Sequence, residues 1–219
     1  MSIPLTADQL LRAYALGVFP MARQHDDPRL YWVDPEKRGI LPLDNFHLPR
    51  SLKKVLRQER FTFRIDSAFE GVMGLCAEST ARRPETWINA EIARLFTELH
   101  HAGLAHSVES WQGDRLVGGL YGLSMGAAFF GESMFSRATD ASKGALAYLV
   151  AVLRKGGYTL LDTQFVTDHL AQFGTVEIPR KEYLRLLAKA LETPANFQGG
   201  LGLDELLALL SVQSTTQTS

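Results

Sequence analysis

The middle of this 219-residue chain changes from helical to strand-like patterning, and this change limits the folds open to it. Three strand-like runs joined by short turns occupy residues 106–111, 115–123 and 127–135, which predicts an antiparallel meander. A helical pattern at residues 141–153 then precedes a strand-like run at 158–164. Strand, helix and strand in this order form a parallel crossover unit. We therefore predict an α+β fold with a mixed sheet and flanking helices.

Helices are predicted on both sides of this central region. Cap residues, apolar spacing and closing glycines mark them, and they cover residues 6–17, 67–77, 89–101, 179–191 and 201–210, with a basic helix between residues 47 and 64. Asp140 is a suitable cap for the helix that begins at Ala141. A strand is expected at residues 61–65, whereas the prolines of residues 21–49 predict loops and short strands.

Composition indicates an ordinary globular protein. Hydrophobic residues make up 46% of the chain and charged residues 21%, which argues against disorder. The formal net charge of -1 lacks the basic excess typical of nucleic-acid binders, so any RNA contact must be local. Cys76 is the single cysteine, and no apolar run approaches the about 18 residues that span a bilayer. We expect a cytoplasmic protein without membrane contact.

The basic helix carries its charges on one side. Arg50, Lys53, Lys54 and Arg57 follow i, i+3, i+4 and i+7 spacing, which places them on one helical face. Such a stripe is suited to contact phosphate groups. An ordinary solvated helix face is an equally open interpretation.

Asp162 and Gln164 are the first candidates for chemistry. They stand two apart at the end of a predicted strand, so their side chains leave the same face of the sheet. Ligands commonly bind at the carboxyl ends of parallel strands, and a carboxylate and an amide could act there as a pair. A hydrogen-bonded pair at a sheet edge is the alternative.

Glu132 is the second candidate, because it lies in the apolar run of residues 129–135. An acid in such a run is costly to bury without a partner. It either meets a cationic group in a largely apolar pocket or pairs with Arg137 or Lys143. His169 is suited to acid–base work, or to a structural hydrogen bond.

Several strings of residues follow one another in a fixed order: HSVESW, LVGGLYGLSMG, GESMFS, ASKGAL and LLDTQ. Together with LTADQLLRAYALGVFP, YWVDP, FHLPRSL, TWI and EIPRKEYL, they resemble the leucyl/phenylalanyl-tRNA protein transferase family over roughly residues 5 to 190. The resemblance implies a GNAT-like (acyl-CoA N-acyltransferase-like) catalytic domain at residues 61–195. A small N-terminal α/β subdomain would occupy residues 1–60, and a C-terminal helix and tail residues 196–219.

The resemblance also implies an activity. The family transfers leucine or phenylalanine, with methionine as a further option, from charged tRNA to proteins that begin with Lys or Arg. This modification would mark those proteins for degradation through the N-degron route. No cofactor is implied, because the ester that joins an amino acid to tRNA is already activated toward an amine. We expect the enzyme to be a monomer.

Residues that match the family's substrate contacts are spread along the chain. Trp32 and Trp87 match tryptophans associated with the terminal adenosine of tRNA, where stacking tolerates any base; core packing is the alternative. Leu120, Phe129 and Met134 match the lining of an apolar pocket for the aminoacyl side chain.

The reacting centre, carried over in the same way, falls on Asp162 and Gln164, with Glu132 nearby. We hypothesise that Gln164 orients the acceptor amine, while Asp162 orients Gln164 and favours the developing positive charge. Thr163 departs from the family's usual cysteine. Tyr31 and Met21 likewise depart from aromatic positions, which bears on adenosine contacts and substrate choice.

Two other functions compete with this one. A GNAT-type N-acetyltransferase that uses acetyl-CoA would share the fold, since fold does not fix function. Such enzymes need a glycine-bearing turn before a helix to hold pyrophosphate, and residues 136–140 contain no glycine. A noncatalytic tRNA-binding module would use the basic helix and exposed aromatic side chains without turnover.

Overall fold

The computed structural model describes residues 5–79 and 86–211. Its helices and strands are, in chain order, α1 (Ala7–Ala15), β1 (Phe19–Ala22), β2 (Leu30–Val33), β3 (Lys37–Ile40), the 3-10 turn η1 (Leu43–Asn45), α2 (Arg50–Arg57), β4 (Thr62–Ile65), α3 (Phe69–Ala77), α4 (Ala90–His101), β5 (Ala105–Gln112), β6 (Arg115–Met125), β7 (Ala128–Ser136), α5 (Ala141–Lys155), β8 (Leu160–Gln164), α6 (Asp168–Ala171), β9 (Val176–Pro179), α7 (Arg180–Glu192) and α8 (Leu203–Ser211).

A seven-stranded mixed sheet forms the centre of the molecule, with the strand order β4-β5-β6-β7-β8-β3-β9. Neighbouring strands from β4 to β7 are antiparallel, which confirms the predicted meander. β8 pairs with β7 in parallel after the crossover through α5, as predicted. β3 then pairs antiparallel with both β8 and β9. The chain therefore has the α+β class and the mixed sheet that the sequence indicates.

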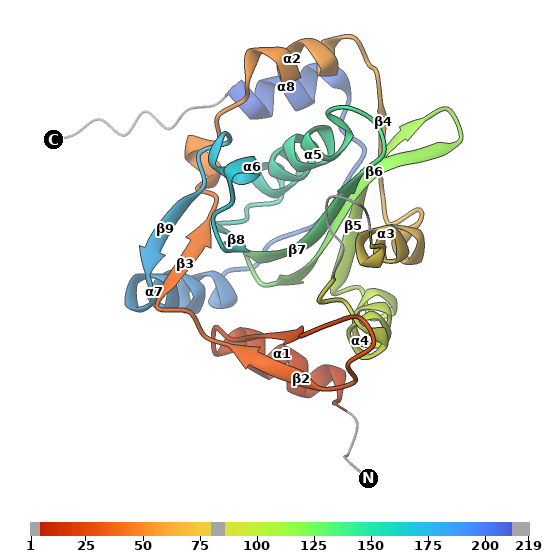
Figure 1. Ribbon diagram of the computed structural model, residues 1–219. Coiled ribbons are helices and arrows are strands. Elements are labelled where there is room, and N and C mark those ends of the chain that lie inside the picture. Colours follow the sequence, from red (N-terminus) through yellow and green to blue (C-terminus); the bar gives the residue numbers. More distant parts are fainter. Residues whose placement is uncertain (1–4, 80–85, 212–219) are drawn as a thin grey trace, which may run out of the picture.

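Helices cover the two faces of this sheet and divide the core into two clusters. On one face, α5 is buried along almost its whole length and packs against α2, η1 and α8. On the other face, α1, α3, α4 and α7 enclose a second cluster of apolar side chains. Figure 1 shows α2 and α8 together beyond α5, with the small β1–β2 sheet at the opposite end. Because α5 lies inside the fold, its sequence is apolar on nearly every side.

The helix ends agree with their sequence signals in most places. Thr6 and Gln9 form a reciprocal capping box at the start of α1, and the Asn89 side chain caps α4. The predicted cap of α5 is wrong. Asp140 has left-handed backbone torsions, with φ 67°, and its carboxylate makes an ion pair with Lys143 at 3.1 Å instead of a capping hydrogen bond.

The HSVESW string has a structural explanation in Glu109, which is fully buried on β5. Its carboxylate accepts hydrogen bonds from the backbone N–H of Ala68 at 2.9 Å and from the Ser107 hydroxyl at 2.8 Å. The Ser67 hydroxyl and the Trp111 indole also donate to it. An acid from a strand thus satisfies the open end of α3, which begins without a capping side chain of its own.

The boundaries of the predicted subdomains stay predictions. β3 comes from the first 60 residues yet lies inside the seven-stranded sheet, so this part of the chain contributes to the main core. Likewise α8, from the predicted C-terminal segment, packs against α5. None of the helices in the described part of the chain combines the length and apolar character needed for a membrane span.

Candidate active site

The candidate site lies where β7 and β8 separate. The two strands pair in parallel from Ala128–Leu160 to Phe130–Asp162, and both become irregular beyond that point. Gly122 pairs with Gly131 and Tyr121 with Ser133, which leaves Glu132 as an extra residue on β7. Thr163 is the extra residue on β8, since Ile40 pairs with Asp162 and Gly39 with Gln164. Such bulges commonly lie next to active sites and redirect side chains.

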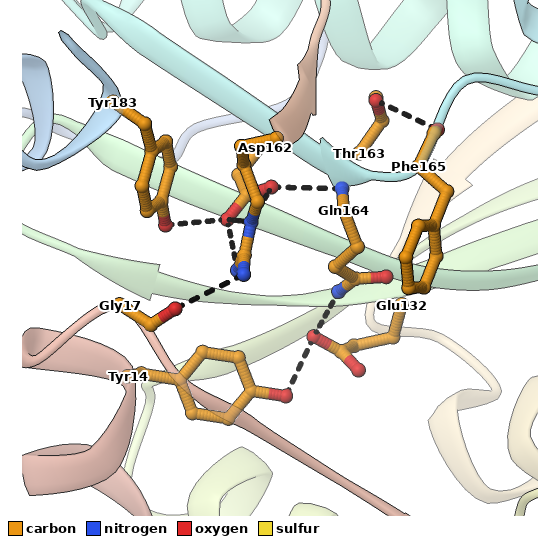
Figure 2. Close-up of polar contacts among 9 residues, drawn as sticks. Tyr14, Gly17, Glu132, Asp162, Thr163, Gln164, Phe165 and Tyr183 are labelled. Carbon is orange, nitrogen blue, oxygen red and sulfur yellow. Dashed lines mark hydrogen bonds and ion pairs between the residues drawn. The ribbon is translucent and has the colours of Figure 1, made fainter. Parts of the chain in front are cut away.

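The side chains of Glu132 and Gln164 meet across this opening, as Figure 2 shows. Gln164 Nε2 donates to Glu132 Oε1 at 2.9 Å, and the Tyr14 hydroxyl donates to the same oxygen at 2.8 Å. The second oxygen, Oε2, is buried and has no hydrogen-bond partner among the described residues. Glu132 therefore holds one oxygen in place and offers the other to a ligand.

Burial raises the pKa of Glu132 to about 8. The negative charge of Asp162 raises it further, whereas the hydrogen bonds from Tyr14 and Gln164 and the charge of Arg38 lower it. A carboxyl group with this pKa can both accept and release a proton near neutral pH. Carboxyl groups that do general acid–base work are commonly shifted in this way.

Asp162 is held differently, because it is fully buried and already paired. Arg38 donates to its carboxylate through Nε at 2.9 Å and through Nη2 at 2.7 Å. The Tyr183 hydroxyl donates at 2.7 Å and the backbone N–H of Gln164 at 2.8 Å. The predicted proximity of Asp162 and Gln164 is thus observed. Asp162 contacts the backbone of Gln164, however, and it does not line the neighbouring pocket.

A pocket of about 700 Å³ opens beside Glu132 and Gln164. Its apolar wall consists of Leu120, Met134, Leu146, Leu149, Leu161 and Leu170. Aromatic side chains, including Trp87 and Phe165, lie at other points of the lining. Glu132 is the one acidic residue in the lining that the structure describes. The cavity therefore suits an apolar side chain next to a group that carries or develops positive charge.

Two of the predicted substrate contacts lie outside this lining. Phe129 is fully buried and stacks on Phe197, with ring centroids 5.4 Å apart. Its strand is still paired with β8 at this point, so the C-terminal segment covers the side chain. Trp32 lies on β2, where it is 44% exposed. The other matched positions, Trp87, Leu120 and Met134, do line the pocket.

Glu132 pairs with neither cation suggested by the sequence. Lys143 makes its ion pair with Asp140 at 3.1 Å, and Arg137 pairs with Glu78. His169 does reach the pocket, and its Nε2 is buried without a hydrogen-bond partner among the described residues. Burial lowers the pKa of His169, and nearby Lys143 lowers it further.

The basic stripe lies on α2, as the spacing predicts. Leu52, Val55 and Leu56 are buried on the inner face of this helix. Arg50, Lys54 and Arg57 are exposed and Lys53 is half-buried on its outer face. Within the described part of the chain, none of these four cations makes an ion pair, and they remain open to an anionic partner.

Three residues of the site carry no signal in the sequence that reveals their role. Tyr14 follows the apolar spacing of α1 and resembles a core residue, and Tyr183 does so on α7. Arg38 lies in a proline-rich region and resembles a surface charge, yet it is 1% exposed. Their partners lie far away in the sequence, so local patterns could not identify them.

Comparisons with known proteins place the chain among relatives with one description. Residues 40–188 match the family described as leucyl/phenylalanyl-tRNA protein transferase, and residues 4–36 match the N-terminal domain of that family. A leucyl/phenylalanyl-tRNA protein transferase from Paramagnetospirillum magneticum is 68% identical over 89% of this chain and 93% of its own length. The corresponding proteins of Rhodospirillum rubrum and Maricaulis maris are 57% and 56% identical over 97% of this chain and at least 98% of their own lengths. The solved structure of L-PGS from Bacillus licheniformis overlaps more loosely, with a TM-score of 0.41 and 14% identity over 75% of this chain and 55% of that chain.

Proposed function

Because the chain belongs to the leucyl/phenylalanyl-tRNA protein transferase family, it is an aminoacyltransferase, and we propose that the transfer takes place in the pocket between β7 and β8. The enzyme moves an amino acid from tRNA to the N-terminus of a protein. One observation carries the assignment of the site. An apolar cavity meets a buried acid, Glu132, with one oxygen free and one hydrogen-bonded.

The apolar wall is the proposed place for the leucyl or phenylalanyl side chain. Leu120 and Met134 belong to this wall, together with leucines from α5 and β8. A charged aminoacyl group would lose its hydration there without gaining a partner, which costs several kcal/mol and explains its exclusion. Trp87 is the proposed stacking partner for the terminal adenosine, because it lines the same pocket. Trp32 lies exposed on β2 and is available to the tRNA end outside the cavity.

Gln164 is proposed to orient the acceptor amine. Its Nε2 donates to Glu132, so its Oε1 remains free to accept a hydrogen from the amine. The amine nitrogen attacks the ester carbonyl, the new N–C bond forms, and the π electrons move to the carbonyl oxygen. Glu132 Oε2 takes the proton that the nitrogen gives up. The C–O bond to ribose then breaks, and the proton passes from Glu132 to the ribose oxygen.

The proton transfers in this scheme are well matched in energy. A protein N-terminus has an unperturbed pKa of about 7.7 to 8.0, so part of it is deprotonated near neutral pH. Burial raises the pKa of Glu132 to about 8, close to that of the amine. Moving a proton in either direction therefore costs little. Asp162 has a positioning role in this scheme, because Arg38 already occupies its carboxylate.

The acceptor is proposed to begin with Lys or Arg, as the family resemblance implies, and its modification to serve the N-degron route. A cationic acceptor requires an acidic contact, and Glu132 is the acid available in the described lining. The GNAT-like architecture is supported by the parallel strands β7 and β8, which part where the site lies. A monomeric state and a cytoplasmic location complete the proposal.

The α2 stripe is proposed to bind the tRNA backbone, and replacing three of its cations tests this role. In Lys53→Ala/Lys54→Ala/Arg57→Ala, the KM for Leu-tRNA should rise while the kcat for leucine transfer stays unchanged. The dependence of binding on salt should weaken by roughly 0.7 to 0.9 in log–log slope for each phosphate that the variant no longer neutralises. The measurement is transfer of labelled leucine from Leu-tRNA at several salt concentrations.

A matched control removes three cations from another helix. Lys181, Arg185 and Lys189 are exposed on α7, which lies at the opposite end of the molecule from α2 (Figure 1). Their replacement by alanine should leave the KM for Leu-tRNA at its parental value. Equal effects of the two triple variants would reduce the α2 stripe to a contribution of overall charge.

A further inference from the structure

Arg38 is a charged residue in the interior of the protein. It is 1% exposed, and its guanidinium lies between the rings of Phe19 and Tyr183, 4.4 Å and 4.6 Å from their centroids. Burying an ion pair such as Arg38–Asp162 contributes little net stability, and well-packed apolar side chains often do as well. The stability of the fold alone is therefore a weak explanation for an arginine at this place.

One arm of the guanidinium reaches the support of Glu132. Arg38 Nη1 donates to the backbone carbonyl of Gly17 at 3.0 Å. Gly17 follows the end of α1, and its φ of 85° allows the chain to turn there. The same helix carries Tyr14, whose hydroxyl donates to Glu132. Arg38 thus anchors the end of the helix that holds the carboxyl group.

The other arm reaches the support of Gln164. Arg38 Nε and Nη2 donate to the carboxylate of Asp162, which accepts the backbone N–H of Gln164. Gln164 has a φ of 61°, a left-handed conformation that costs roughly 1–2 kcal/mol in a residue other than glycine. Strain of this kind persists where surrounding contacts enforce it. The Arg38–Asp162 pair provides such a contact.

The neighbouring glycine adds a second contact from β3 to the same turn. A Cβ atom added at Gly39 would lie 2.5 Å from the carbonyl carbon of Phe165 and 2.9 Å from the backbone nitrogen of Val166. β3 therefore packs directly against the backbone that follows Gln164. No side chain fits between the two segments without moving one of them.

We infer that Arg38 is a positioning residue for aminoacyl transfer, whose guanidinium fixes Glu132 and Gln164 relative to each other by holding α1 and β8 at the same time. The inference rests on the proposed roles of Glu132 and Gln164. It requires the planar fork of arginine, because a lysine ammonium is a point charge that cannot span both arms in the same geometry. The segment around β3 is then part of the catalytic apparatus without contacting substrate.

Arg38→Lys tests this inference, since it keeps the charge and removes the fork. The kcat for leucine transfer should fall on the order of 100-fold, the loss expected for a displacement of about 1 Å between reacting groups. The KM values for Leu-tRNA and acceptor should stay at parental levels. The pH profile should keep its midpoint, because the positive charge beside Asp162 remains. Arg180→Lys is the control, as Arg180 makes an exposed ion pair with Asp34 at 2.5 Å, and it should retain parental kcat.

Hydrogen exchange of the Gln164 backbone amide gives a readout that is independent of activity. This N–H donates to Asp162, and its exchange should accelerate in Arg38→Lys and also in Gly39→Ala, which serves if the first variant does not fold. Parental kcat together with parental exchange in a folded variant overturns the inference. Absence of transfer in the parental protein overturns the proposed function instead, and exchange then decides the positioning role alone.

Discussion

Glu132→Gln is expected to lower the kcat for aminoacyl transfer by about 10²- to 10⁴-fold, the range that a positioned acid–base group contributes. The amide keeps the shape of the side chain and an oxygen that accepts from Tyr14 and Gln164, as Glu132 Oε1 does. What it loses is the ability to take a proton at the second position. Single-turnover transfer of labelled leucine, with kcat and KM determined separately, measures the effect.

The same variant shows whether the carboxyl group has the raised pKa. Its folded pKa of about 8 exceeds the ordinary 4.5, so the folded parent binds the proton more tightly and loses stability as pH rises through that window. Glu132→Gln has no such loss. Its unfolding temperature relative to the parent should therefore increase from about pH 5 to about pH 9, with each unit of displacement corresponding to about 1.4 kcal/mol. A constant difference contradicts the raised pKa.

The division between kcat and KM decides the role of Glu132. A fall in kcat at constant KM for the acceptor belongs to an interaction made in the transition state. A raised KM for an Arg-starting acceptor with unchanged kcat would move Glu132 to recognition of the cationic side chain.

Asp162→Asn is expected to lower the free energy of unfolding by about 3–5 kcal/mol, because it leaves the buried charge of Arg38 without its anion. Arg38 is 1% exposed and cannot regain water without disrupting the core between Phe19 and Tyr183. Denaturant unfolding measures the loss. Transfer should also fall, since Gln164 loses the carboxylate that accepts its backbone N–H.

Removing both charges separates stability from activity. In Arg38→Met/Asp162→Leu the site holds apolar side chains, a replacement that often restores or exceeds the original stability. The double variant should unfold close to the parent while its transfer rate stays low. Parental transfer in a stable double variant would show that neither residue positions the site.

Most of the fold could be predicted because its elements are marked by local patterns. Strand alternation and short turns mark β5, β6 and β7, and apolar spacing with a Thr6 cap marks α1. The placement of Glu132, Gln164 and Asp162 followed from the strands that carry them. Phe129 was assigned to the pocket because its coverage by Phe197, a residue far along the chain, is invisible in the pattern.

The supports of the site could not be predicted, for a physical reason. Tyr14 and Glu132 are separated by 118 positions, and Arg38 and Asp162 by 124. Hydrogen bonds over such separations leave no period in the sequence. The extra residues at Glu132 and Thr163 are equally silent, because a bulge depends on the register of the neighbouring strand.

The central claim is that this pocket transfers an aminoacyl group to the N-terminal amine of a protein. Transfer of labelled leucine from Leu-tRNA to a model protein that begins with Arg, beside the same protein beginning with Ala, tests it most directly. The account predicts label on the Arg-starting protein alone, at its N-terminal amine, with strong loss in Glu132→Gln. A folded enzyme that gives no transfer from Leu-, Phe- or Met-tRNA to the Arg-starting protein would contradict it.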